Sequence, residues 1–350
     1  MPAAPSTVSQ WTLRSRPTGQ LALEHFKLER RALPAPDQGE AAVRVDYLAM
    51  DPAIRGFMND SGTYAAPIEP GQPIRGMILG TVVASRAAEL AVGDVVWGFG
   101  SWSDHIVAAA AQLHRVAKDR AAKGSAPDPD LLHRRGTIGL TAYYGLTEIA
   151  QVRRGDRVLV SGAAGAVGSL AGQIARQLGA SRVVGIAGGP DKCRRAIDRY
   201  GYDHCIDYKA AADLPAALAG ALPDGLDVYF DNVGGEALGA AVDLLRKDGR
   251  IALCGMISGY DGRNAQTPPN LWNLVAQTAA MRGFRVTDML GDQAFLAKAK
   301  ADLDRWIASG NLRGDLDIRD GLDRAPAAFL SLFSGGNSGR LLVHVSGENE

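Results

Sequence analysis

The chain has 350 residues, of which 46% are hydrophobic, and its 38 basic side chains balance its 38 acidic ones. This length is enough for two domains with sizeable cores, and the charge balance excludes the strongly basic field that attracts nucleic acids and anionic membranes. No run of about 18 apolar residues occurs, and the first ten residues lack the charged and apolar regions of a signal peptide. We therefore expect a soluble, cytoplasmic protein.

Short strand-like runs, separated by glycine and proline, fill the chain from Trp11 to about Ala111. In one of them Val43, Val45 and Tyr47 alternate with polar residues, which predicts a strand with one face in water. The polar stretch 118–135 predicts an irregular connection, and a helix is expected from residue 136. The strands expected in this part are Leu21–Leu23, Ala42–Tyr47, Gly80–Ala84, Asp94–Trp97 and His105–Ala108.

A strand, a glycine turn and a helix follow one another between Arg157 and Gly179. Val158, Leu159 and Val160 form a short apolar run typical of a strand buried in a parallel sheet. From Val167 onward the apolar residues recur at helical spacing until the chain reaches Gly179, where a helix is expected to end.

The turn between them, Ala163-Ala-Gly-Ala-Val-Gly168, matches the dinucleotide fingerprint G-x-G-x-x-G at its second and third glycines and has alanine at the first. Gly165 would let the backbone approach a pyrophosphate, and Gly168 would let the helix pack closely on the strand. The free amides at the helix start would face the phosphates. A tight turn without a ligand is the alternative, but the position between a strand and a helix favours the cofactor site.

The residues beyond the fingerprint bear on the choice of cofactor. NAD-binding sites carry an acidic residue roughly 20 residues past the glycines, whereas this chain has Ala187-Gly-Gly189 there. Lys192 and Tyr208 follow, a cation and a hydroxyl that can hold the 2′-phosphate of NADP. Asp191 stands beside Lys192, which leaves a solvated lysine as the alternative. The spacing favours NADP over NAD.

Strands and helices alternate through the rest of the chain, which predicts βαβ units and a doubly wound parallel sheet in an α/β protein. The expected strands are Arg182–Ala187, His204–Asp207, Asp227–Phe230, Arg250–Cys254, Arg282–Val286 and Arg340–Val345, and the expected helices include Lys192–Tyr200, Ala237–Leu245 and Gln293–Ser309.

Ligands of such sheets bind beyond the carboxyl ends of the strands. The loops expected there are Asp231–Gly235, Gly255–Tyr260 and the end of Gly283–Val286. Each loop taken alone has a simpler explanation in turn chemistry or packing. Three such loops at one edge favour a binding site.

Several motifs together resemble the zinc-independent medium-chain dehydrogenase/reductases, and most of all the NADPH-dependent alkenal/enone double-bond reductases, which include prostaglandin and curcumin reductases. The resemblance covers nearly the whole chain. It rests on the glycine turn, Tyr229-Phe-Asp-Asn-Val-Gly-Gly235, Gly249-Arg-Ile-Ala-Leu-Cys-Gly-Met-Ile-Ser-Gly-Tyr260 and Gly335-Gly-Asn-Ser-Gly-Arg340.

The resemblance implies a GroES-like β domain over residues 1–136, a Rossmann NADP-binding domain over 137–305, and a C-terminal segment, 306–350, that returns to the first domain. It also implies a homodimer. One departure concerns the substrate pocket, because many relatives have an aromatic residue after Asp51-Pro52 where this chain has Ala53.

The resemblance also assigns site residues. Lys192 and Tyr208 match the contacts to the 2′-phosphate of NADP(H), and Tyr260 matches the tyrosine that hydrogen-bonds the substrate carbonyl. The residues implied for the pyrophosphate are Gly165, Ala166, Val167 and Gly168. Those implied for the rest of the cofactor are Asn232, Cys254, Gly255, Met256, Ile257, Ser258, Tyr260, Phe284, Arg285, Val286 and Asn337.

The expected reaction is reduction of the C=C bond of α,β-unsaturated aldehydes and ketones by hydride transfer from NADPH to the β-carbon. No metal is expected, because no cysteine precedes Cys193 and nothing supplies the three protein ligands of a catalytic zinc. The expected partner is a small-molecule enone or enal, with no nucleic acid and no membrane. Two alternatives stay open: a quinone reductase of the same superfamily, and a non-catalytic NADPH-binding protein.

Overall fold

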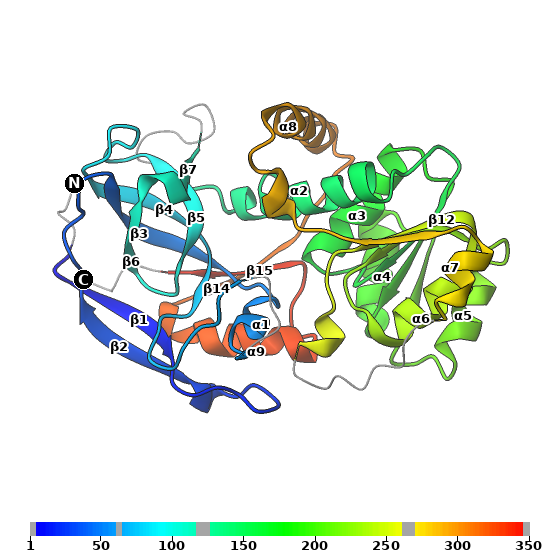
Figure 1. Cartoon of the computed structure of the whole chain (residues 1–350), viewed down its shortest axis with the longest axis horizontal. Helices are drawn as coiled ribbons and strands as arrows, with labels where there is room; N and C mark the ends of the chain where they lie inside the picture. Colours follow the sequence, from blue (N-terminus) through cyan, green and yellow to red (C-terminus); the bar gives the residue numbers. More distant parts are fainter. Residues whose placement is uncertain (1–4, 61–64, 117–126, 261–269, 346–350) are drawn as a thin grey trace. The chain divides into compact units, whose positions relative to one another are not determined.

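The computed structural model describes residues 5–60, 65–116, 127–260 and 270–345 (Figure 1). The chain divides into two compact units. The first unit runs to Leu132 and also contains Leu316–Asn337 and the chain from Leu341 onward. The second unit consists of His133–Asp315 and Ser338–Arg340. None of the helices in the described ranges is long and apolar enough to cross a membrane.

The first unit is built on antiparallel sheets. The strands β1 (Thr7–Leu13) and β2 (Phe26–Ala32) form a two-stranded sheet that shares an apolar cluster with a seven-stranded sheet. The larger sheet has the order β14-β15-β3-β4-β5-β7, and β6 also pairs with β3. The larger sheet consists of β3 (Glu40–Ala49), β4 (Arg75–Ser85), β5 (Val95–Ser101), β6 (His105–Ala109), β7 (Leu113–Arg115), β14 (Leu316–Asp320) and β15 (Arg340–His344), and the helices are α1 (Ile54–Phe57) and α9 (Ala325–Ser334).

One prediction for this unit is confirmed in part and another is wrong. Val43 and Val45 are buried while Arg44 between them is exposed, as the alternation predicts, but a register shift follows and the end of β3 packs its other face in a second apolar cluster. Val43 and Val45 lie in one cluster and Ala49 in the other. The strand expected at Leu21–Leu23 is absent, because the chain there leads into a 3-10 helix at Leu23–His25.

The second unit contains a six-stranded sheet of order β10-β9-β8-β11-β12-β13, and every neighbouring pair is parallel. The doubly wound parallel sheet is thereby confirmed. Its strands are β8 (Arg157–Ser161), β9 (Arg182–Ala187), β10 (His204–Asp207), β11 (Leu226–Asp231), β12 (Leu245–Leu253) and β13 (Ala280–Gly283), and its helices are α2 (Thr137–Tyr144), α3 (Ala166–Gln177), α4 (Pro190–Tyr200), α5 (Leu214–Ala221), α6 (Gly235–Asp243), α7 (Trp272–Ala276) and α8 (Gln293–Ala308).

Burial on both faces explains why β8 reads as an unbroken apolar run. Val158, Leu159 and Val160 are fully buried. Val158 and Val160 pack in a cluster that contains residues of α3, while Leu159 packs in a cluster that contains residues of α5 and α6. One expected strand is displaced: β13 ends at Gly283, and a 3-10 turn begins at Val286.

The strand order determines where a ligand can bind. From β8 the chain proceeds outward to β9 and β10 on one side of the sheet, and then returns to build β11, β12 and β13 on the other side. This reversal creates a switch point between β8 and β11, where open α/β sheets bind their ligands beyond the carboxyl ends of the strands.

Candidate cofactor and active site

The glycine turn after β8 is held tightly in place. A Cβ atom added at Gly168 would lie 2.1 Å from the carbonyl oxygen of Gly162, so only glycine allows α3 to start so close to the strand. The buried Tyr202 hydroxyl donates to the Gly168 carbonyl at 2.6 Å. The His133 ring nitrogen Nε2 lies 3.4 Å from the Ala166 carbonyl oxygen. These contacts hold the first turn of α3 from the side of the protein interior.

The start of α3 suits an anion. Gly165 precedes the helix, and no side chain caps it. Among the described residues, none accepts a hydrogen bond from the amides of Val167 and Gly168. Free amides at the positive end of a twelve-residue helix form the kind of site that binds phosphate groups. The residues predicted for the pyrophosphate therefore lie where free backbone amides can donate hydrogen bonds to phosphate oxygens.

Lys192 stands in the first turns of α4 and forms no ion pair within the described residues. Its pKa is lowered, first by burial and then by the positive charges of Lys209 and Arg195. Asp191, the neighbour that offered the alternative explanation, instead pairs with Arg194. Lys192 is therefore a half-buried cation in a basic environment, which is favourable for a phosphate dianion.

Tyr208 lies next to this basic group and is 51% exposed. A Cβ atom added at Gly188 would lie 2.8 Å from the Tyr208 ring and 3.1 Å from Cε of Lys209. The loop after β9 therefore needs a glycine to let both side chains approach. Reasoning from the sequence missed Lys209 and Arg195. Their positive charge was the available signal, but nothing in the spacing connected them with Lys192.

The loops after β11 and β12 are joined by hydrogen bonds. The amides of Cys254 and Gly255 donate to the Asp231 carbonyl at 2.8 and 3.1 Å, and the Ile257 amide donates to the Asn232 carbonyl at 3.3 Å. The Ser258 hydroxyl donates to the Val233 carbonyl at 2.5 Å. The structure thus brings the predicted residues of these two loops together.

Asn232 is held from the neighbouring strand. Its amide donates to the Ser161 hydroxyl oxygen at 2.8 Å, and its side-chain Nδ2 donates to the Ser161 carbonyl at 2.7 Å. Ser161 is the last residue of β8, so the loop after β11 is tied to the strand that precedes the glycine turn.

Tyr260 ends the second of these loops. Its hydroxyl oxygen accepts a hydrogen bond from the Met256 amide at 3.4 Å. Burial raises its pKa above the ordinary value of 10.0, and the nearby Cys254 and Asp231 act in the same direction. The hydroxyl is therefore protonated at neutral pH, and no residue in the described ranges accepts its hydrogen. Burial together with the charge of Asp231 also raises the pKa of the Cys254 thiol to about 12.

The remaining predicted residues lie in several places. Phe284 packs edge-on against Phe230 and Tyr144, with ring centroids 6.1 and 5.6 Å apart. Arg285 is exposed and pairs with Asp288 at 2.9 Å, and Val286 is half-buried. Asn337 belongs to the first unit, directly before the segment Ser338–Arg340 of the second.

Two family models match the chain. One, described as the N-terminal domain of oxidoreductase, matches residues 9–116, and the other, described as zinc-binding dehydrogenase, matches residues 166–300. Relatives more than 30% identical match along nearly the whole chain. The chain belongs to the medium-chain dehydrogenase/reductase family. Despite the name of the second model, the described residues contain no group of three or more histidine, cysteine, aspartate or glutamate side chains suited to a metal ion, so they do not fit a catalytic zinc.

Three family members illustrate the similarity. The chain is 33% identical to the NADPH-dependent curcumin reductase of Escherichia coli, over 97% of both chains. It is 36% identical to the NADP-dependent 2-alkenal reductase of Nicotiana tabacum, over 88% of both chains. The crystal structure of CurA from Vibrio vulnificus in complex with NADPH matches 97% of this chain and 99% of that chain, with a TM-score of 0.88 and 36% identity.

Proposed function

We propose that this NADP(H)-dependent oxidoreductase reduces the C=C double bond of α,β-unsaturated aldehydes and ketones. The observation that carries the proposal is Tyr260, a neutral hydroxyl held by the loops that follow β11 and β12 at the carboxyl edge of the parallel sheet. The relatives named as curcumin and 2-alkenal reductases support it.

The chain offers residues for each part of the cofactor. The amides at the start of α3 would bind the pyrophosphate, and Lys192 and Tyr208, aided by Lys209 and Arg195, would bind the 2′-phosphate. The joined loops from Asn232 and from Cys254 would surround the nicotinamide half.

In the proposed reaction NADPH supplies a hydride to the β-carbon of the substrate. The carbonyl oxygen then gains negative charge, and the Tyr260 hydroxyl would donate a hydrogen bond to it. The Met256 amide, which donates to the Tyr260 oxygen, would polarise that hydroxyl and make it a better donor. A proton from water or a weak acid completes the product at the α-carbon.

The first experiment measures loss of NADPH absorbance with a 2-alkenal, an acyclic enone and a quinone, and formation of NADPH from a secondary alcohol with NADP, each repeated with the non-phosphorylated cofactor. We expect turnover of the alkenal and the enone with a strong preference for NADPH. Deuterium at C4 of NADPH is expected at the β-carbon of the product, and deuterium from solvent at the α-carbon. Turnover of the quinone alone would assign the chain to the quinone reductases, and tight NADPH binding without turnover would indicate a non-catalytic binding protein.

We also propose that the protein forms a homodimer through β13. This strand ends the six-stranded sheet, and no described strand pairs with its outer edge. The preceding helix α7 and its flanking residue expose Leu271, Trp272 and Val275, with Trp272 73% exposed. An unpaired edge strand beside exposed apolar side chains favours association. Light scattering is expected to give twice the chain mass for the wild type and the chain mass for Trp272→Arg, and a monomeric wild type would refute the dimer.

A further inference from the structure

Asp231, the last residue of β11, is fully buried and accepts hydrogen bonds from every side. Its Oδ1 atom accepts from the Ser161 hydroxyl at 2.8 Å, the Tyr229 hydroxyl at 2.7 Å, the Val233 amide at 2.9 Å and the Gly234 amide at 3.0 Å, and its Oδ2 atom accepts from the Gly234 amide at 3.1 Å. The carboxylate therefore shapes the turn that carries Asn232.

The same residue anchors the second loop through its backbone. Its carbonyl oxygen accepts from the amides of Cys254 and Gly255. The Ser161 hydroxyl, which donates to the carboxylate, also accepts from the Asn232 amide. Asp231 is thus the residue on which both loops of the candidate site converge.

The Asp231 carboxylate has no ion-pair partner within the described ranges. Each of its hydrogen bonds comes from an N–H or O–H donor, which is the set of contacts that suits an ionised carboxylate. Its charge acts on the loop above it, because it contributes to the raised pKa values of Cys254 and Tyr260.

The strand order determines which half of the cofactor lies nearest to this charge. The basic group around Lys192 and Tyr208 follows β9 and β10, and the glycine turn follows β8. A dinucleotide that crosses the switch point with its adenosine half over β9 and β10 must extend its nicotinamide half over β11 and β12. Asp231 ends β11 and would therefore lie beneath that half.

We propose that Asp231 is a positioning residue whose buried negative charge favours the oxidised cofactor over the reduced one. The nicotinamide ring is positively charged in NADP⁺ and neutral in NADPH, so a fixed anion stabilises the first relative to the second. The inference rests on the cofactor placement of the proposed function. It does not depend on the identity of the substrate.

The test is the ratio of the dissociation constants of NADP⁺ and NADPH, measured by calorimetry without substrate. In Asp231→Asn we expect this ratio to rise on the order of tenfold, the effect of one unit charge within about 10 Å of another in a protein interior. Tyr229→Phe is the matched control, because it removes one donor to the carboxylate and keeps the charge. The ratio of the two dissociation constants in this control is expected to equal that of the wild type or to fall below it.

If Asp231→Asn weakens the binding of NADP⁺ and NADPH equally, Asp231 has only a structural role and the proposal is overturned. A higher ratio of the two dissociation constants in Tyr229→Phe would also overturn it. If Asp231→Asn does not fold, the double variant Ser161→Ala/Tyr229→Phe decides. In this double variant fewer donors compensate the carboxylate charge, so we expect the ratio of the NADP⁺ and NADPH dissociation constants to fall. An unchanged or higher ratio would refute the charge effect. Because no substrate is present, a protein that reduces no enone can still give the expected ratio, so this test and the proposed function can fail separately.

Discussion

At the scale of single residues, the candidate site combines a cation for a phosphate with a neutral hydroxyl for a carbonyl. Lys192 is half-buried, and the positive charges of Lys209 and Arg195 act on it. Tyr260 is half-buried at the end of a loop whose amides donate to the carbonyls of Asp231 and Asn232. Burial lowers the pKa of the lysine and raises that of the tyrosine, because in both it disfavours the charged form.

For Lys192→Gln we expect a loss of NADPH affinity on the order of 10 to 100-fold, because a charge-assisted hydrogen bond is removed. NADH affinity should stay within about twofold, since NADH lacks the 2′-phosphate. Calorimetry with both cofactors measures the two values. Lys247→Gln, an exposed lysine on β12, is the matched control and should leave both affinities unchanged.

The lowered pKa of Lys192 adds a pH dependence. The preference for NADPH over NADH requires the charged lysine, so it is expected to decrease as the pH rises through the pKa of this group. Because burial and the positive charges of Lys209 and Arg195 lower that pKa below the ordinary lysine value of 10.5, the decrease should begin at a lower pH than an ordinary lysine would give. Cofactor affinities measured at increasing alkaline pH test this, and a constant preference would contradict the role of Lys192.

For Tyr260→Phe we expect kcat with an alkenal to fall about a hundredfold, the typical cost of removing one donor to a developing oxyanion. NADPH affinity should change less than about twofold. Since the pKa of Tyr260 is raised, any loss of kcat from tyrosine ionisation should begin at a higher pH than an ordinary tyrosine would give. Tyr200→Phe, which removes a donor to Asp315, is a control that should retain turnover. Full activity of Tyr260→Phe would exclude its role.

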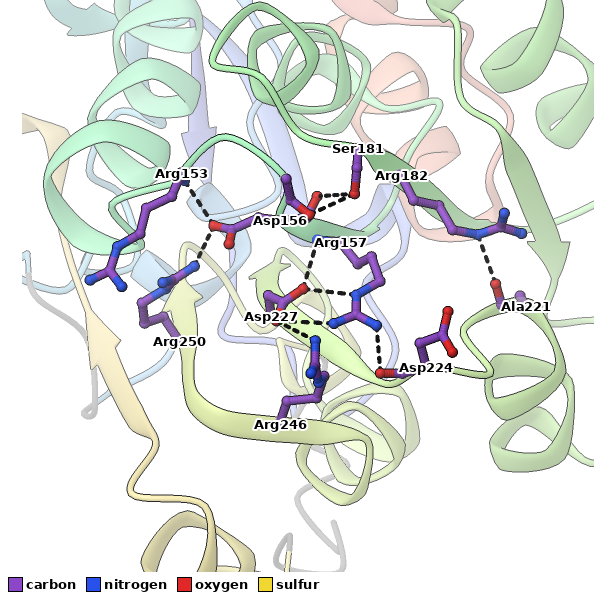
Figure 2. Close-up of polar contacts among 11 residues, drawn as sticks. Arg153, Asp156, Arg157, Ser181, Arg182, Ala221, Asp224, Asp227, Arg246 and Arg250 are labelled. Carbon is purple, nitrogen blue, oxygen red and sulfur yellow. Dashed lines mark hydrogen bonds and ion pairs between the residues drawn. The ribbon is translucent and has the colours of Figure 1, made fainter.

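At the scale of elements, the two ends of the parallel strands have different roles. The carboxyl ends carry the site loops, while the amino ends carry a network of arginine and aspartate side chains (Figure 2). Arg157 at the start of β8 binds Asp227 of β11 through Nε at 2.9 Å and also donates to the Asp224 carbonyl at 2.6 Å. Arg250 of β12 pairs with Asp156. These contacts connect the central strands β8, β11 and β12 away from the site.

Asp227→Asn is expected to lower the free energy of unfolding by about 2 to 4 kcal/mol, because it leaves the largely buried Arg157 without its ionic partner. The two side chains are only 13% and 19% exposed. NADPH affinity should stay the same, since the network lies at the opposite edge of the sheet. Denaturant unfolding measures the first effect.

The control is Asp191→Asn, which breaks the pair with Arg194, where the side chains are 68% and 84% exposed. It is expected to change stability by less than about 0.5 kcal/mol. Equal losses in the two variants would show that burial does not determine the strength of these pairs.

At the scale of the whole molecule, the end of the chain contributes to both compact units. Ser338–Arg340 belongs to the second unit, where Gly339 bridges to Gly165 in parallel fashion and the Arg340 amide donates to the Asp315 carbonyl at 2.9 Å. From Leu341 the chain joins the first unit, in which β15 lies between β14 and β3. A few residues near the end of the chain therefore support the phosphate turn of one unit and a central strand of the other.

Gly339→Ala is expected to lower stability by about 2 to 4 kcal/mol and to weaken NADPH binding. Gly339 has φ +76°, and its added Cβ would lie 2.3 Å from the Asp315 carbonyl oxygen. Left-handed strain costs about 1 kcal/mol and the clash adds about 1 to 3. Gly310→Ala, with φ +74° and open space around the Cβ, should show the strain alone. Equal effects of the two changes on stability and on NADPH binding would contradict the support of the phosphate turn by Gly339.

Local patterns predicted much of the second unit. The bounds expected for β9 and β10 agree with the structure, and α3 begins at Ala166, inside the expected turn and one residue before the helical spacing expected from Val167. These features depend on residues that are close in the chain, namely apolar periodicity and glycine at the turn. β1, β2 and β14 were missed, because their exposed and mixed side chains give no clear alternation.

The sequence by itself therefore determined the βα alternation, the glycine turn and the absence of an acidic residue after β9, since each is written in consecutive residues. Only the tertiary structure decided that β3 contributes to two different apolar clusters, that Lys209 and Arg195 join Lys192, and that Asp231 supports two loops. Each of these depends on strand order and on contacts between residues far apart in the chain, which local periodicity does not encode.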